Sequence, residues 1–315
     1  MEKLKAGILE LDRFILGAGR LGEEERRKEC FAILDRYLDA GFRTLDVARS
    51  YCGGRCEEFL GQYLKKKDRS RITIISKGGF PLSRTEMYKT RLSEKELRKD
   101  LEASLKALGT DYIDLYFLHR DKPDVPPEEM LYSLNKFIRE GKVREIGASN
   151  WSCGRIGTAN RFAEKNDLRP FAASQINFSY ALTTPALTGD ITHITMNDIE
   201  YRWYRENAFP LIAYSVQAKG FFTKYFSGEE LKKSGKLSYL PLEENFRRAE
   251  RIRALSLEKC VPIPALLISY VLSKEIPAAA IGGFSNTGQL EESLPGAELR
   301  LTKQEIQFLE GEDLA

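Results

Sequence analysis

Four side chains in the first half of this chain could together move a proton: Asp46, Tyr51, Lys77 and His119. A lysine ammonium beside a phenol favours the phenolate, so we expect Lys77 to lower the pKa of Tyr51 toward neutral, with Asp46 neutralising and positioning the lysine. Such a phenol is a good proton donor, and His119 could donate a hydrogen bond to the same carbonyl oxygen. This set would serve a reaction in which an oxygen gains a proton while its carbon gains a hydride from a nicotinamide cofactor.

Asp46, Lys77 and His119 end or directly follow short β-type runs, and a short linker separates Tyr51 from the run that contains Asp46. These runs alternate along the chain with longer amphipathic helical runs. The alternation is typical of βα units around a parallel sheet. Eight strands are predicted, the number that closes a barrel, at 14–18, 43–47, 72–76, 113–119, 144–149, 172–176, 211–215 and 278–282. We therefore expect an α/β fold, a single (β/α)8 TIM barrel formed as one domain by residues 1–315.

The segments between the strands predict the rest of the architecture. Helices are expected at 23–41, 57–66, 93–109, 127–141, 152–165 and near 245–273, with Ser93 and Glu96 forming a capping box. The leading segment 5–14 alternates polar and apolar residues and predicts an N-terminal β-hairpin that closes the barrel floor. Long connections at 78–92, 178–200 and 216–243 are expected to be functional.

The carboxyl ends of the strands meet at one mouth, where this architecture keeps its active sites. One aspartate or lysine at a strand end is usually a cap or a solvated residue. Here polar residues end five successive strands whose interiors are apolar. Such a set favours one functional site over five unrelated caps or solvated residues.

Composition excludes several other classes of function. Lys+Arg 49 against Asp+Glu 46 gives a net charge of +3 with both signs interspersed, so nucleic-acid binding is not indicated. No apolar run approaches the roughly 18 residues of a membrane span, and residues 1–15 lack the apolar core of a secretory signal. We expect a cytoplasmic protein.

The five cysteines are odd in number and scattered, which fits reduced thiols. Cys52 and Cys56 are close together in sequence, but no second pair of closely spaced cysteines follows them, and the only histidines are His119 and His193. No metal site is predicted.

The chain resembles the aldo-keto reductases over essentially its full length. The resemblance rests on LDVARSYCGGRCEEFLGQYL, IISKGG, DYIDLYFLHRDKP, GKVREIGASNW, SQINFSY, LIAYSVQAKGFF and AIGGFSNTGQLEES. It implies an enzyme that reduces an aldehyde or ketone to the alcohol, or runs the reverse reaction, with Tyr51 as general acid, Lys77 and Asp46 as the pair that tunes it, and His119 orienting the substrate. It also implies an extended NADPH across the barrel mouth, in keeping with the absence of a G-x-G-x-x-G motif.

The resemblance assigns cofactor contacts to the strand ends and the loops after them. Tyr214 would stack on the nicotinamide ring, and Glu292 would lie near the adenine. The residues implied for the nicotinamide carboxamide are Ser149, Asn150 and Gln175. Those implied for the pyrophosphate are Ser215, Lys219 and Gly220.

Two departures from the family pattern matter. Cys52 stands where a glycine is usual, directly after Tyr51. At the last strand, where family members often place Lys or Arg for the 2′-phosphate of NADPH, this chain offers only uncharged residues: Gly283, Ser285, Asn286 and Gln289. A phosphate without a cation loses charge-assisted hydrogen bonds. The family favours NADPH, with NADH as the alternative.

The substrate pocket is expected among aromatic residues of the loops, namely Tyr88, Trp151, Phe178 and Tyr180. Two other functions stay open. Lys77 could form a Schiff base as in a barrel aldolase, although an Asp46 partner would favour the charged ammonium. The chain could also be a nicotinamide-binding regulatory or redox-sensing subunit with slow turnover, in the manner of the potassium-channel β-subunits of the same family.

Overall fold

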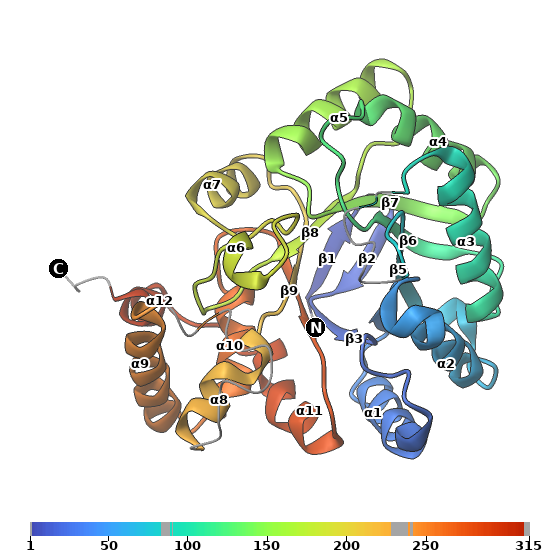
Figure 1. Cartoon of the computed structure of the whole chain (residues 1–315). Helices are drawn as coiled ribbons and strands as arrows, with labels where there is room; N and C mark the ends of the chain where they lie inside the picture. Colours follow the sequence, from blue (N-terminus) through green and yellow to red (C-terminus); the bar gives the residue numbers. More distant parts are fainter. Residues whose placement is uncertain (1, 83–88, 90, 228–238, 240–241, 312–315) are drawn as a thin grey trace.

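Eight parallel strands close into a barrel in the computed structural model, which describes residues 2–82, 89, 91–227, 239 and 242–311 (Figure 1). Each strand pairs with the next one along the chain, and the last closes on the first through the register Ile281 to Ile15. The strands are β3 Phe14–Gly17, β4 Thr44–Asp46, β5 Thr73–Gly78, β6 Ile113–Leu118, β7 Val143–Ser149, β8 Ala173–Asn177, β9 Leu211–Tyr214 and β10 Ala278–Gly282. All eight strand predictions are confirmed.

Near-continuous burial explains why these short segments form strands. Every residue of β6 and of β8 is buried, because a parallel strand in a barrel is covered by side chains inside and by helices outside. Such strands are predictable as apolar runs, and a polar residue among them stands out at the end of the run.

The predicted hairpin is present as β1 Lys3–Ala6 and β2 Leu9–Asp12, paired antiparallel. Its residues Leu4 and Leu11 belong to the apolar cluster inside the barrel, together with Ile75 and Leu115. The Asp12 carboxylate accepts hydrogen bonds from the backbone N–H groups of Arg43 and Thr44, at the start of β4. The hairpin therefore closes the amino-terminal end of the barrel, opposite to the strand ends that carry the predicted site.

Helices surround the barrel (Figure 1). They are α1 Arg27–Asp39, α2 Arg55–Leu64, α3 Glu94–Leu108, α4 Pro127–Arg139, α5 Cys153–Lys165, α6 Pro185–Thr188, α7 Asp198–Glu206, α8 Phe221–Phe226, α9 Glu244–Lys259, α10 Ile263–Leu272, α11 Thr287–Ser293 and α12 Lys303–Glu310. The capping box of Ser93 and Glu96 is confirmed at the start of α3.

Two predicted helices differ from expectation. The 23–41 run begins with a 3-10 turn at Glu24–Arg26 before α1, and the run near 245–273 is two helices. Cys260 caps the end of α9 in a left-handed conformation, and Pro262 is the residue just before α10, so the chain turns sharply between the two helices. Among the described residues no single helix is long and apolar enough to cross a membrane. Within that described part of the chain, α9 and α10 taken together are the one pair that passes the test, with a bend of 102° between them.

Candidate active site

Lys77 lies at the centre of a buried hydrogen-bonded group at the carboxyl ends of β4 and β5. Its ammonium donates to Asp46 Oδ1 at 2.7 Å, to the Val47 carbonyl at 3.0 Å and to the Tyr51 hydroxyl at 3.2 Å. Lys77 is fully buried and Asp46 nearly so, while Tyr51 is half-buried. The three residues that the sequence predicts to act together are therefore in direct contact.

A tight turn after β4 brings Tyr51 back to the barrel mouth. Cys52, Gly53 and Gly54 have φ angles of 50°, 67° and 97°, so three successive residues lie in the left-handed region. Glycine adopts this conformation without steric penalty, whereas a residue with a Cβ adopts it only at a steric cost. Cys52 therefore occupies a position suited to glycine, at a cost in backbone strain directly beside Tyr51.

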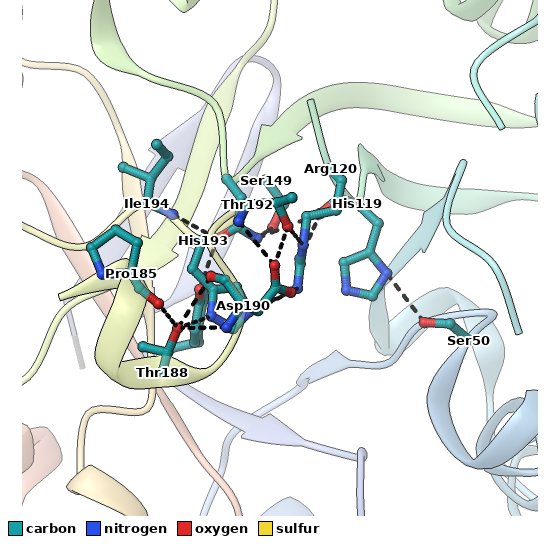
Figure 2. Close-up of polar contacts among 12 residues, drawn as sticks. Ser50, His119, Arg120, Ser149, Pro185, Thr188, Asp190, Thr192, His193 and Ile194 are labelled. Carbon is teal, nitrogen blue, oxygen red and sulfur yellow. Dashed lines mark hydrogen bonds and ion pairs between the residues drawn. The ribbon is translucent and has the colours of Figure 1, made fainter. Parts of the chain in front are cut away.

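His119 follows β6 and faces Tyr51. Their rings meet edge to face with centroids 5.7 Å apart, and the Phe80 ring is 5.2 Å from His119 on another side. His119 Nδ1 lies 3.2 Å from the Ser50 hydroxyl, as Figure 2 shows. If Ser50 donates its proton to Nδ1, the neutral imidazole carries its own proton on Nε2. The sequence prediction did not include Ser50, although it directly precedes Tyr51.

Burial sets the protonation states of this group. It raises the pKa of Tyr51 above its ordinary value, because the Lys77 charge opposes that shift without outweighing it. The lowering toward neutral expected from Lys77 alone is therefore wrong for the protein by itself. Burial, with the nearby charges of Arg120 and Lys77, places the pKa of His119 well below its usual range. Burial also disfavours the Lys77 ammonium, but Asp46 and Tyr51 overcome this and raise its pKa.

Residues from the next strand ends extend the group. Gln175 donates from Nε2 to the second oxygen of Asp46 at 2.9 Å, which fixes that carboxylate between an amide and Lys77. Asn150 donates to the Ser149 hydroxyl at 3.0 Å and accepts from the Tyr214 hydroxyl at 2.7 Å. The residues predicted to bind the nicotinamide are thus hydrogen-bonded to one another or to Asp46 at the barrel mouth.

A cavity of about 620 Å³ extends from Asp46 and Tyr51 along the ends of β9 and β10. Its volume lies in the ordinary range for small-molecule sites. The predicted cofactor residues that line it are Tyr214, Ser215, Lys219, Gly220, Gly283, Ser285, Gln289 and Glu292. Asn286 lies beside it, with its side chain accepting from the Gln289 N–H at the start of α11.

The walls of this cavity suit a dinucleotide. Gly19, Gly220 and Gly283 line it, so backbone rather than bulky side chains borders much of the space. Lys219 supplies a positive charge on the lining. These features fit a nicotinamide dinucleotide, whose phosphates approach backbone and cations closely.

Backbone strain is concentrated at the same mouth. Asn150, Ser215, Ala218 and Lys219 have φ angles between 48° and 59°, in the left-handed region. Each such residue costs on the order of 1 kcal/mol, and such costs persist mainly where function requires the geometry. The strain supports a functional assignment for the loop after β9.

Arg120 ties the loop between β8 and β9 to the end of β6, as Figure 2 shows. It donates to the His119 carbonyl at 2.9 Å, to Thr192 Oγ1 at 3.0 Å and to Asp190 Oδ2 at 3.1 Å, and its Nη2 lies 2.8 Å from His193 Nε2. Burial, followed by the charge of Arg120, lowers the pKa of His193 to about 4, so its neutral ring can accept from Arg120. Sequence reasoning missed this network.

Three residues predicted for the substrate pocket are buried in the apolar core, and their role in that pocket stays a prediction. Trp151 and Tyr180 are fully buried and Phe178 nearly so, and none of them lines the cavity. The Tyr180 hydroxyl donates to the Leu309 carbonyl at 2.6 Å, toward the outer helices. The rings of all three residues pack against other aromatic rings, Trp151 against Phe171 and both Phe178 and Tyr180 against Tyr270 of α10. Tyr88 lies outside the described residues.

No group of three or more His, Cys, Asp or Glu side chains is arranged to hold a metal ion in the part of the chain that the structure describes. The polar residues of the mouth are instead paired with one another, as described above.

Comparison with known proteins agrees with this geometry. The profile of the aldo/keto reductase family matches residues 13–311. A putative aryl-alcohol dehydrogenase of Schizosaccharomyces pombe is 28% identical, over 96% of this chain and 92% of its own length. Norsolorinic acid reductase B of Aspergillus parasiticus is 26% identical, over 94% of this chain and 78% of its own length.

Two further similarities complete the comparison. A putative voltage-gated potassium channel subunit beta of Schizosaccharomyces pombe is 34% identical over 56% of this chain and 51% of its own length. A crystal structure of a thermostable aldo-keto reductase with the inhibitor epalrestat has the same fold, with a TM-score of 0.75 at 22% identity and coverage of 98% of each chain. The chain belongs to the aldo/keto reductase family of oxidoreductases.

Proposed function

We propose that this protein reduces an aldehyde or ketone to the alcohol with NADPH, and catalyses the reverse reaction when alcohol and oxidised cofactor are supplied. The observation that carries the proposal is the contact of Lys77 with both Asp46 and Tyr51 at one end of a cavity suited to a dinucleotide. When bound there, the reduced nicotinamide supplies a hydride to the carbonyl carbon.

The proton comes from this chain. Tyr51 O–H transfers its proton to the carbonyl oxygen as the carbon accepts the hydride, and the resulting phenolate remains beside the Lys77 ammonium at 3.2 Å. Asp46 keeps Lys77 charged, since it accepts a hydrogen bond from the ammonium in a site where burial alone would favour the neutral amine. Neutral His119, with its Nε2 proton, donates a hydrogen bond to the same carbonyl oxygen and orients it toward Tyr51.

Cofactor binding is assigned to the strand ends around the cavity. Ser149, Asn150 and Gln175 would hold the nicotinamide carboxamide, and Tyr214 would lie against the ring. The groups proposed for the phosphates and the adenosine are Ser215, Lys219, Gly220, Gly283, Ser285, Asn286, Gln289 and Glu292.

An aromatic carbonyl compound is the proposed substrate class. The names of two relatives, an aryl-alcohol dehydrogenase and a norsolorinic acid reductase, support it. Phe80 also supports it, because its ring packs 5.2 Å from His119 and offers an apolar face next to the residue proposed to orient the carbonyl group.

The geometry disfavours the aldolase alternative. A Schiff base requires a neutral lysine nitrogen with a free lone pair. The three protons of the Lys77 ammonium instead have three acceptors, in Asp46, Val47 and Tyr51, and its pKa is raised. Borohydride treatment in the presence of a carbonyl substrate should therefore leave Lys77 unmodified, as mass spectrometry would show.

Oxidation of NADPH with a panel of aromatic and aliphatic aldehydes, ketones and the corresponding alcohols tests the proposal. Repeated turnover at roughly 1 per second or more for at least one carbonyl compound is expected of an enzyme. Oxidation of a single equivalent of bound cofactor, with no further turnover on any compound, would instead favour the redox-sensing function suggested by the channel subunit relative.

A further inference from the structure

The cavity end formed by the residues after β10 contains no cation from its own segment. Residues 283–293 include neither lysine nor arginine, and the polar residues there that line the cavity are Ser285, Gln289, Glu292 and Ser293. A 2′-phosphate bound at this end would meet hydroxyl and amide groups and the Glu292 carboxylate, with no positive charge unless another part of the chain contributes one.

Arg20 supplies such a charge from the other end of the sequence. Its Nη1 donates to the Ser285 hydroxyl at 3.3 Å, and both residues line the same cavity. The barrel closure explains this contact. β3 and β10 are hydrogen-bonded neighbours, with Gly282 paired to Leu16, so the residues that follow the two strands leave the barrel side by side.

The Arg20 guanidinium is available for an anion. It is exposed, and it takes part in no ion pair within the described part of the chain. Nearby Arg26 also reaches this loop, donating to the Ser285 carbonyl, but Glu23 and Glu29 neutralise its charge. Arg20 is therefore a cation at the cavity that has a hydroxyl partner and, among the residues that the structure describes, no carboxylate partner.

We propose that Arg20 and Ser285 together bind the 2′-phosphate of NADPH, so that a residue of the first barrel loop determines the choice of NADPH over NADH. A guanidinium forms paired, charge-assisted hydrogen bonds with a phosphate, and the Ser285 hydroxyl lies within reach of the same group. This inference rests on the proposed function, since it assumes that the cavity holds a nicotinamide dinucleotide.

Calorimetric titration of three purified proteins tests the inference: the wild type, Arg20→Met and Arg20→Lys. Each protein is titrated with NADPH, NADH, 2′,5′-ADP and 5′-ADP. Arg20→Met should weaken NADPH and 2′,5′-ADP about tenfold and leave NADH and 5′-ADP within about twofold, because only the first two carry the 2′-phosphate. Arg20→Lys should recover part of the loss. Arg36→Met is the matched control: it removes an exposed arginine that pairs with Glu291 of α11, away from the cavity lining, and should change none of the affinities.

Other outcomes have distinct meanings. Equal loss of NADPH and NADH in Arg20→Met would place Arg20 at the pyrophosphate and overturn the inference, as would unchanged affinity for NADPH. If 2′,5′-ADP binding depends on Arg20 but no carbonyl compound is turned over, the subsite stands and the proposed reaction fails. If the wild type binds none of the four compounds, both proposals are wrong.

Discussion

At the scale of single residues, Lys77 links the parts of the site. Its three protons are directed to a carboxylate, a backbone carbonyl and the Tyr51 phenol, so its charge is held where a phenolate would form. Burial opposes the effect of the Lys77 charge on Tyr51, because it raises the pKa of the phenol and keeps it protonated. The protein by itself is therefore poised to donate a proton from Tyr51.

This protonation state predicts the pH dependence of reduction. Reduction requires protonated Tyr51, whose raised pKa keeps its proton across neutral pH, and neutral His119, whose lowered pKa keeps it uncharged there. We expect kcat/KM for reduction to be flat from about pH 6 to about pH 9 and to fall only at more alkaline pH, as Tyr51 loses its proton. Steady-state kinetics across that range would check this, and a fall centred near pH 7 would indicate a near-neutral phenol instead.

Cys52 predicts an effect on stability. Its φ of 50° is in the left-handed region, so Cys52→Gly should remove strain and raise the free energy of unfolding by up to about 1 kcal/mol. Cys52→Ala keeps a Cβ at the same backbone angle and serves as the control, with stability near that of the wild type. Urea unfolding of the three proteins measures the difference. A glycine variant no more stable than the alanine variant would argue against strain at this position.

At the scale of elements, hydrogen bonds and an ion pair hold the loop from Pro185 to Thr195 in place. Arg120 joins it to the end of β6 through Asp190, Thr192 and His193, and the Ile194 N–H donates to Asn150 Oδ1 at 3.2 Å. The same guanidinium lies over the Phe80 ring, at 4.9 Å from its centroid. The loop is thus positioned relative to His119 by one buried cation.

Arg120→Met should release this loop. The side chains of Arg120 and Asp190 are only 10% and 8% exposed, so removing one leaves the other buried without its partner, at a cost of about 3 kcal/mol of unfolding free energy. We expect faster amide exchange in the loop and a higher KM for carbonyl substrates. Hydrogen exchange and steady-state kinetics measure these effects.

Arg155→Met is a suitable comparison, because Arg155 of α5 forms a similarly buried pair with Asp121, next to Arg120, and makes no ion pair or hydrogen bond with the Pro185–Thr195 loop in the part of the chain that the structure describes. It should lower stability while leaving exchange of the Pro185–Thr195 loop and KM close to those of the wild type. An equal rise in KM in both variants would show that the effect reflects general destabilisation.

The strands and most helices were predictable because their signals are local. Buried parallel strands are apolar runs, and Ser93 with Glu96 marks a helix start within four residues. The predicted proton-transfer residues lie together because Asp46, Lys77 and His119 stand at the carboxyl ends of three neighbouring strands, and a short turn after β4 adds Tyr51. Arg20 and Arg120 gave no such signal, because each acts through partners far away in sequence. The burial of Trp151 and Tyr180 depends on their packing against Phe171 and Tyr270, which are distant in sequence, and was equally inaccessible from sequence.

At the scale of the whole molecule, the apolar residues that close the barrel floor and the residues of the proposed active site lie at opposite ends of the barrel. The hairpin packs Leu4 and Leu11 into the amino-terminal end of the barrel, while the cavity and Lys77 lie at the carboxyl end. That residues 1–315 form one domain stays a prediction, consistent with this arrangement around a single barrel.

The separation predicts the effect of changes at the floor. Leu11 is fully buried there, so Leu11→Ala should lower the free energy of unfolding by about 2 to 5 kcal/mol and leave the affinity for NADPH unchanged. Ile8→Ala, in the same hairpin but 66% exposed, should cost less than about 0.5 kcal/mol. Urea unfolding and cofactor titration measure both effects. Weakened NADPH binding in folded Leu11→Ala would show that the two ends are coupled.

The most direct test of the central claim is Tyr51→Phe, which removes only the hydroxyl that contacts Lys77. Single-turnover oxidation of bound NADPH by a carbonyl substrate should slow by about 100-fold or more, since the general acid is lost, while the dissociation constant for NADPH stays within about twofold. Undiminished hydride transfer in this variant would contradict the assignment of Tyr51 as the proton donor.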